Sequence, residues 1–262
     1  MSNAPLLLAV GGVDSSHGAG LDADRDAASA FECELHETAS AITDQDLFEV
    51  RRVEERLLWN REAEPLLDGG RVDALKFGLL PGVASIVEAA RLVARARHGD
   101  PRVPAVVDPV ARSSSGYRFW NDRELVSVRD SLLVAGPILT PNLDELAELA
   151  WADRSRLDDS DDARVDAAAT LLRGGASAVV ATGGHGPERG DQVRDLVLQP
   201  GAEPVWIERK REPGEGIRGS GCRFATALAC GLARGNDLQG SARAAGEFVA
   251  QRIREASAPE GR

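Results

Sequence analysis

Short apolar segments alternate with longer amphipathic segments along most of the chain, and this alternation constrains the fold more than any other feature. The apolar segments, each bounded by Gly, Pro, Asp or Asn, are the expected strands: 6–10, 72–77, 103–107, 138–140 and 178–182. Helical periodicity lies between them, over 21–31, 53–67, 83–96, 122–133, 143–151 and 162–172. Because the strands are continuously apolar, we expect parallel strands covered by helices on both faces, an α/β protein of the three-layer α/β/α sandwich type.

The last third of the chain departs from this alternation. Two strand-like runs, 193–198 and 203–207, flank a turn signal at residues 199–202, which predicts an antiparallel hairpin at an edge of the sheet. Two helices, 221–234 and 238–256, are expected to close the chain. The predicted sheet is therefore mostly parallel, with an antiparallel edge hairpin.

Composition limits the partners and the compartment. Lys and Arg number 31 against 42 Asp and Glu, and the net charge of −11 argues against nucleic acid or an anionic membrane as partner. Cys33, Cys222 and Cys230 have neither disulfide-scaffold nor zinc-site spacing, so we expect a reducing, cytoplasmic location. No apolar run approaches the length of a membrane span. We expect one domain, 1–262, in which residues 1–4 are extraneous or disordered.

Two glycine-rich loops are the first candidates for chemistry. Residues 11–20, GGVDSSHGAG, directly follow the first strand, where an open parallel sheet binds its ligands, but they lack the spacing of a dinucleotide or Walker motif. This loop fits a structural turn as well as a binding loop. Gly219-Ser220-Gly221-Cys222 precede an expected helix, so several N–H groups and the positive end of the helix dipole converge into an anion hole.

Cys222 stands in the first turn of that helix, close in sequence to Arg218 and Arg223. Two cations and the helix dipole should lower the pKa of the thiol, and a thiolate at this place can serve as a base. The alternative is that Gly219 and Gly221 form only an N-terminal turn and that Cys222 is a small buried hydrophobic residue.

Polar residues also follow two other expected strands. Asn142 and Glu145 have the spacing of a helix capping box, which accounts for both residues without any chemistry. Asp108 directly follows the strand 103–107, where its carboxylate either holds a cation or caps a turn. Because Lys76 and Lys210 are the only lysines, phosphate charge would fall mostly to arginine, backbone N–H groups and a metal ion.

These elements occur together in an order that resembles the hydroxymethylpyrimidine and phosphomethylpyrimidine kinases of thiamin synthesis, in the ribokinase superfamily. The start, GGVDSSHGAGLDAD, is similar to that family's GSDSGGGAGIQAD, and the register continues from Gly20 without a gap to Gln45. The other matches are KFGLL at 76–80, DPV at 108–110, TPNL at 140–143, GGH at 183–185 and GSGC at 219–222. The joint match covers almost the whole chain and implies a ribokinase-like fold.

The resemblance implies that the chain transfers a phosphate from ATP, with Mg²⁺, to 4-amino-5-hydroxymethyl-2-methylpyrimidine and to its monophosphate. It places the pyrimidine against Gly12, Asp14, Gln45, Leu79 and Val110, the nucleotide against Asn142, Thr182 and Gly184, and the metal against Asp108 and Glu145. It makes Gly219, Ser220 and Gly221 the anion hole for the transferred phosphate and Cys222 the base. A homodimer is the assembly that such relatives suggest.

Four positions depart from the family pattern. His17 replaces a glycine of the first loop, and Leu79 replaces a methionine near the pyrimidine. Ser114 and Thr182 stand where the family has lysines in its phosphate region. These departures make the handling of the nucleotide phosphates the main open question about the site.

Two further questions follow from the departures. Arg112, Arg218 and Arg223 are the candidates to replace the lysine charge, because guanidinium binds phosphate well, and the sequence does not choose among them. Thr182 also occurs in pyridoxal-kinase-like relatives, so a pyridoxal-type vitamin kinase is the alternative enzyme. A non-catalytic pyrimidine-binding homologue is the third hypothesis.

Overall fold

The computed structural model describes residues 4–45, 49–184, 191–214 and 216–257. Its strands are β1 (Leu6–Asp14), β2 (Glu34–Gln45), β3 (Val50–Glu55), β4 (Ala74–Phe77), β5 (Ala105–Val107), β6 (Ile138–Leu139), β7 (Ala178–Ala181), β8 (Gln192–Leu198) and β9 (Val205–Lys210). Its α-helices are α1 (Leu21–Ala30), α2 (Asn60–Asp68), α3 (Gly82–Gly99), α4 (Asp122–Ser127), α5 (Leu143–Ala150), α6 (Arg154–Asp159), α7 (Asp161–Arg173), α8 (Ser220–Ala233) and α9 (Leu238–Ser257).

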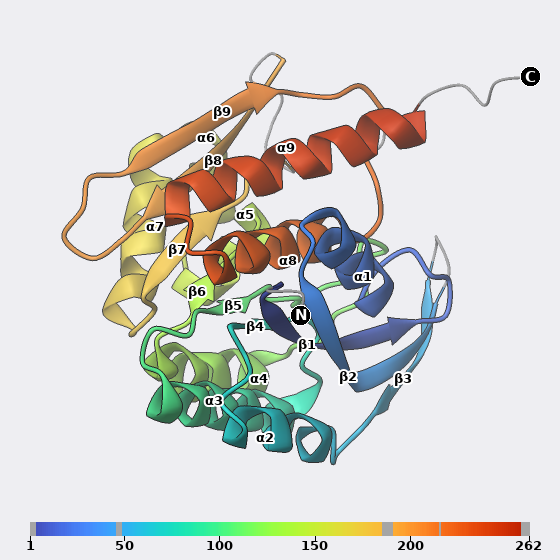
Figure 1. Cartoon of the computed structure of the whole chain (residues 1–262). Coiled ribbons are helices and arrows are strands. Elements are labelled where there is room, and N and C mark those ends of the chain that lie inside the picture. Colours follow the sequence, from blue (N-terminus) through green and yellow to red (C-terminus); the bar gives the residue numbers. More distant parts are fainter. Residues whose placement is uncertain (1–3, 46–48, 185–190, 215, 258–262) are drawn as a thin grey trace, which may run out of the picture.

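The described strands join one sheet in the order β3-β2-β1-β4-β5-β6-β7-β8-β9 (Figure 1). From β2 to β7 in that order, neighbouring strands are parallel. β8 pairs antiparallel with both β7 and β9, which confirms the predicted edge hairpin. The carboxyl ends of β1, β4, β5, β6 and β7 therefore meet at one edge of the sheet.

Helices cover both faces of the sheet and enclose two apolar cores (Figure 1). Helices α2 to α7 pack on one face, with Phe77, Ile86 and Leu146 among the buried side chains. Helices α1, α8 and α9 cover the other face, where Leu228 and Phe248 are buried. This arrangement is the predicted three-layer α/β/α sandwich. Within the described residues, every helix is too short or too polar to cross a membrane.

The structure corrects the sequence prediction at one edge of the sheet. The expected helix 53–67 is divided, because its first residues belong to β3 and α2 begins only at Asn60. β2 and β3 form an antiparallel pair that the search for apolar runs misses. Many residues of both strands are polar and at least partly exposed, so pairing with the sheet, rather than an apolar face, makes them strands.

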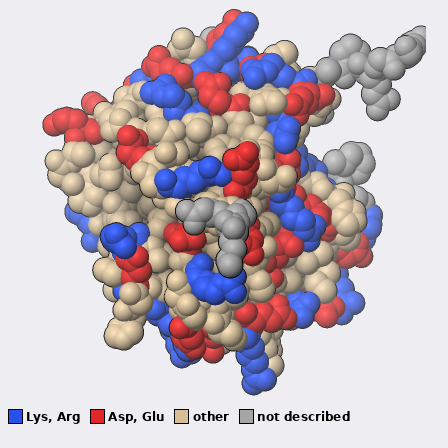
Figure 2. Space-filling view, in the orientation of Figure 1, with Lys and Arg blue, Asp and Glu red and all other residues tan. Residues whose placement is uncertain are grey.

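The aspartate-rich stretch 153–166 extends the expected helix 162–172 toward the N-terminus. The structure has the short helix α6 before α7, which begins at Asp161. The Asp153 carboxylate caps α6 by accepting from Ser155 N at 3.0 Å. Figure 2 shows basic and acidic side chains interspersed over one face of the molecule, a distribution unlike the basic surface of a nucleic-acid-binding protein.

Candidate active site

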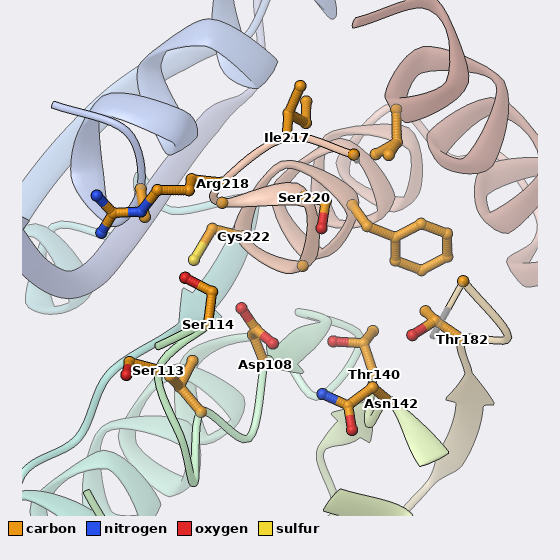
Figure 3. A pocket seen from close by; sticks show the side chains of 18 of the residues that line it. Asp108, Ser113, Ser114, Thr140, Asn142, Thr182, Ile217, Arg218, Ser220 and Cys222 are labelled. Atoms are coloured by element: carbon orange, nitrogen blue, oxygen red, sulfur yellow. The ribbon is translucent and has the colours of Figure 1, made fainter. Parts of the chain in front are cut away.

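A cavity of about 940 Å³ lies where the parallel strands end and α8 begins (Figure 3). This is the edge at which open parallel sheets bind their ligands. Every site residue expected from the sequence lines this cavity: Gly12, Asp14, Gln45, Leu79, Asp108, Val110, Asn142, Glu145, Thr182, Gly184, Gly219, Ser220, Gly221 and Cys222. His185, of the GGH motif, lies outside the described residues.

The first glycine-rich loop packs closely against the turn that leads into α8. Gly219 has φ of +70°, and a Cβ there would lie 2.8 Å from Gly18 O and from Ala19 Cα. Gly20 has φ of +61°, and a Cβ there would lie 2.1 Å from Gly12 O. Only glycine fits either position, so the close approach of the two loops depends on Gly219, and the tight folding of the first loop against Gly12 depends on Gly20. The loop is thus part of the cavity wall as well as a turn.

An ion pair holds the two loops together. Arg218 donates to the Asp14 carboxylate at 3.2 Å and to Ser16 Oγ at 2.6 Å. Asp14 also accepts from Ser16 N at 2.9 Å and from Ala19 N at 3.0 Å. Burial raises the pKa of Asp14, but the hydrogen bonds from Ser16 and the charge of Arg218 outweigh it and hold the pKa below its ordinary value. We call Asp14, Ser16, Ala19 and Arg218 the clasp.

Gln45, the last residue of β2, lies beside the clasp. Its Nε2 donates to Thr43 Oγ1 at 3.1 Å, and its side chain contributes to the lowered pKa of Asp14. The Leu79 side chain forms an apolar wall here, since a Cβ on Gly12 would lie 3.0 Å from Leu79 Cδ2. This end of the cavity therefore combines a carboxylate, an amide and an apolar surface, which suits a small polar aromatic ring.

The expected arginine neighbours of the Cys222 thiol are directed elsewhere. Arg223 donates to Asp26 at 2.7 Å and to Arg218 O at 2.8 Å, while the Arg218 guanidinium belongs to the clasp. The Cys222 thiol instead lines the cavity together with Ser114 and Asp108 (Figure 3), and the charge of the Asp108 carboxylate acts on it. Burial raises the pKa of Cys222, and although the nearby charge of Lys76 opposes this effect, the charge of Asp108 adds to it and the pKa stays raised. The predicted thiolate is therefore wrong, and Cys222 is a protonated thiol at neutral pH.

A buried ion pair lies close to this thiol. Lys76 on β4 donates to both oxygens of Asp24 on α1, at 2.7 and 3.0 Å, and the two side chains are fully buried. Thr226 on α8 donates to the same carboxylate at 2.7 Å. Burial alone lowers the pKa of Lys76, but the charge of Asp24 outweighs it, so the ammonium stays charged. This network joins the sheet to both helices beside the anion hole.

Two buried carboxylates, Asp108 and Glu145, face the cavity. Asn142 N donates to Glu145 at 2.9 Å, and Asn142 Oδ1 accepts from Glu145 N at 3.0 Å, so the capping box is present. Burial raises the pKa of Glu145, and the charge of Asp108 raises it further. Burial raises the pKa of Asp108 as well. Two like charges in a buried site favour a cation between them.

These carboxylates fit Mg²⁺ only together with ligands from the substrate. Among the described residues, no group of three or more His, Cys, Asp or Glu side chains is placed to hold a metal ion. Mg²⁺ commonly uses one or two carboxylates and completes its coordination with phosphate oxygens and water. The pair therefore suits a metal ion that arrives with a nucleotide.

Arginines line the cavity in place of the lysines that are missing at Ser114 and Thr182. Arg112 and Arg218 are both in its wall, whereas Arg223 is not. Arg112 donates to Glu148 through two nitrogens, at 3.0 and 2.6 Å. Since Arg218 is held in the clasp, Arg112 is the candidate that remains at the rim. It must exchange Glu148 for phosphate to act there.

Sequence reasoning missed three residues of this site. Asp24 and Thr226, which anchor Lys76, carry no sequence signal on their own, although Asp24 aligns with the final aspartate of the family's GIQAD motif. Arg211, after β9, also lines the cavity and donates to Gly184 O at 2.9 Å. The hairpin brings Arg211 to the site, and the sequence alone does not show this approach.

The family model of phosphomethylpyrimidine kinase matches residues 14–261, which is nearly the whole chain. The chain belongs to the phosphomethylpyrimidine kinase family. Hydroxymethylpyrimidine/phosphomethylpyrimidine kinase of Streptomyces coelicolor is 37% identical over 247 residues, 94% of this chain and 87% of the relative. Pyridoxine kinase of Bacillus subtilis is 28% identical over 260 residues, 95% of this chain and 90% of the relative.

Solved structures of vitamin kinases share the fold. Pyridoxal kinase from Staphylococcus aureus in complex with pyridoxal has a TM-score of 0.82 at 24% identity, over 97% of this chain and 89% of that one. Phosphomethylpyrimidine kinase from Clostridium difficile has a TM-score of 0.74 at 25% identity, over 97% and 99%. The expected ribokinase-like fold is confirmed, and membership of the phosphomethylpyrimidine kinase family makes the chain a phosphotransferase.

Proposed function

We propose that this chain phosphorylates the hydroxymethyl group of hydroxymethylpyrimidine, and then the resulting monophosphate, with ATP and Mg²⁺ in thiamin synthesis. The observation that carries the proposal is the cavity in which the clasp, Gln45 and the α8 anion hole meet. The similarity to the Streptomyces kinase over most of both chains supports it. The volume of about 940 Å³ is in the range of ligand sites and has room for a nucleotide beside a small ring.

The proposed binding mode follows the two ends of the cavity. The pyrimidine lies against Gly12, Leu79 and Val110, with its polar edge toward Asp14 and Gln45. The amide of Gln45 offers both a donor and an acceptor, as an aminopyrimidine edge requires. The nucleotide lies toward Asn142, Thr182 and Gly184, and its phosphates approach the start of α8.

Transfer depends on positioning and on charge neutralisation. The N–H groups at residues 219–221 and the α8 dipole hold the transferred phosphoryl group, and Mg²⁺ near Asp108 and Glu145 neutralises phosphate charge when it is bound. In a loose transition state the hydroxyl proton leaves late. Because Cys222 is a protonated thiol that lines the cavity together with the Asp108 carboxylate, we assign proton acceptance to this pair rather than to a free thiolate.

A pyridoxal-type vitamin kinase is the second candidate. The similarity to the Staphylococcus pyridoxal kinase fold and to Bacillus pyridoxine kinase favours it. The third hypothesis, a non-catalytic pyrimidine-binding protein, does not explain why the anion hole, Lys76–Asp24 pair and facing carboxylates are all present. The proposal also includes a cytoplasmic location, for which the three free cysteines are suited, a single-domain chain and a homodimer as the assembly to test.

A nucleotide-turnover assay distinguishes the three hypotheses. ADP release is measured with Mg²⁺ and ATP alone, with added hydroxymethylpyrimidine, and with added pyridoxal. We expect stimulation by hydroxymethylpyrimidine at least about tenfold above that by pyridoxal. Stimulation by pyridoxal alone would assign the chain to the second class, and binding of the pyrimidine without turnover would assign it to the third.

A further inference from the structure

Cys33 and Cys230 form a pair of thiols outside the cavity. Cys33 lies in the turn between α1 and β2, and Cys230 lies near the end of α8. Cys33 is partly exposed and Cys230 is fully buried, and both are free thiols. Neither lines the active-site cavity, so the mechanism above does not use them.

The turn that carries Cys33 is fixed so that its thiol contacts Cys230. Cys33 Sγ lies 4.0 Å from Cys230 O and 3.7 Å from Phe31 O, so the Cys33 thiol is in contact with Cys230. Arg234, just after α8, donates to Phe31 O and to Glu32 O, each at 2.9 Å. Glu32 has φ of +50°, a conformation that these contacts hold in place. The end of α1 and the end of α8 are thus joined around the thiol pair.

The charges around the pair make Cys33 the more reactive thiol. The hydrogen bond with Cys230 and the guanidinium of Arg234 outweigh burial and the charge of Asp73 and lower the pKa of Cys33 to about 7. The contact with Cys33 and burial raise the pKa of Cys230, so Cys33 is the thiol of the pair that ionises first. Glu32 accepts from Arg234 at 3.2 Å but leaves the guanidinium next to the pair. Cys33 is therefore a partly exposed nucleophile beside a second thiol.

We propose that Cys33 and Cys230 are a redox-responsive pair that a hydroperoxide converts into an intramolecular disulfide. The Cys33 thiolate attacks the outer peroxide oxygen, the O–O bond breaks, and a sulfenic acid and one water (or alcohol) result after protonation. The Cys230 thiol then attacks the sulfenic sulfur, the S–S bond forms, and the hydroxyl leaves with the thiol proton as water. Two thiols are oxidised and one hydroperoxide is reduced.

The test uses the full chain, first reduced and then treated with one equivalent of hydrogen peroxide. After the remaining thiols are alkylated, the protein is digested without reductant and analysed by mass spectrometry. We expect one linked peptide pair, joined through Cys33 and Cys230, while Cys222 is recovered alkylated. Oxidation of Cys33 to sulfinic acid without the link, or links only between separate chains, would overturn the proposal.

Variants separate the roles of the two thiols. Cys230→Ala should still form a sulfenic acid at Cys33, trapped by dimedone, but no internal disulfide. Arg234→Gln should slow alkylation of Cys33 at pH 7 by at least about threefold, because the thiolate fraction falls. The matched control is Arg91→Gln on α3, whose partner Glu88 is remote from the pair, and its rate should be unchanged. Equal rates for Arg234→Gln and the control would contradict the assignment.

Alkylation of the unmodified protein gives a direct comparison that needs no substitution. With iodoacetamide at pH 7, Cys33 should react at least about tenfold faster than Cys222, whose pKa is raised. If Cys222 reacted as fast as Cys33, the proposed order of reactivity would be wrong. The outcome does not depend on kinase activity.

Discussion

The two ends of the cavity are built in different ways. At the pyrimidine end, fixed partners hold the polar groups, since Asp14 accepts from Arg218 and from Ser16. At the nucleotide end, Arg112 is paired with Glu148 at the rim. The first end is ready for its ligand, whereas at the second a guanidinium must change partners when phosphate enters.

This difference indicates where selectivity resides. A carboxylate and an amide that are already fixed recognise one ring edge without further ordering, which favours specificity. A nucleotide end that uses backbone, a metal ion and exchangeable arginine contacts tolerates the loss of the lysines at Ser114 and Thr182. Substitutions at the clasp and at the buried ion pair should therefore have larger effects than substitutions at the nucleotide end.

The largest effect is expected at Lys76, whose buried ion pair with Asp24 joins β4 to α1 beside the anion hole. Lys76→Met leaves the Asp24 carboxylate buried without its cation, so the free energy of unfolding should fall by about 3–5 kcal/mol. Urea unfolding measures the change. The matched control is Arg95→Met, which breaks the solvent-exposed pair with Asp68 and should lower the free energy of unfolding far less, because water screens exposed pairs. Equal losses in the two variants would show that the buried pair has no special role.

The second effect tests the contact between the two loops. Gly219→Ala forces a Cβ to within 2.8 Å of Gly18 O and displaces the N–H groups of the anion hole. We expect kcat/KM to fall by about 10²–10³, as on removal of one donor from an oxyanion hole. Steady-state assays check this against Gly99→Ala, where a Cβ meets no described atom within 4 Å and activity should stay within about twofold. Activity near that of the control would contradict the proposed anion hole.

The third effect is smaller and confined to the pyrimidine end. Gln45→Ala removes an amide beside Asp14 and should raise the KM for hydroxymethylpyrimidine by about 10- to 100-fold, the equivalent of about 1–3 kcal/mol. The KM for ATP should change by less than about threefold. A parallel rise in both constants would mean that Gln45 supports the fold of the site and does not select the ring.

The smallest effect is expected at the nucleotide end. The pKa of Glu145 is higher in the folded protein than in the unfolded chain, so folding stability falls as pH rises from about 4.5 toward that raised pKa. Glu145→Gln removes this penalty but also a carboxylate for the metal ion. We expect unchanged or greater thermal stability at pH 7 without Mg²⁺, and several-fold weaker activation by Mg²⁺. If Glu145→Gln lowered the free energy of unfolding by about 1 kcal/mol and left activation by Mg²⁺ normal, Glu145 would act only in the capping box.

The sequence predicts the layers of the fold and the members of the site better than it predicts their chemistry. Apolar runs and motif order place Asp108, Asn142 and the start of α8 at one cavity, as the structure has them. They do not reveal that Arg223 turns to Asp26 and that burial keeps Cys222 protonated, because side-chain direction depends on tertiary packing. The strand β2 is missed for a different reason: it has no apolar run, and its pairing with β1 and β3 makes it a strand.

The most direct test of the account is competition between two substrates. Equal concentrations of hydroxymethylpyrimidine and pyridoxal are incubated in one reaction with Mg²⁺ and γ-labelled ATP, and the labelled products are separated. The fixed pair of Asp14 and Gln45 predicts that most label appears in the pyrimidine phosphate, and that Gln45→Ala loses most of this preference. Label mainly in pyridoxal phosphate, or a preference that Gln45→Ala leaves intact, would contradict the central claim.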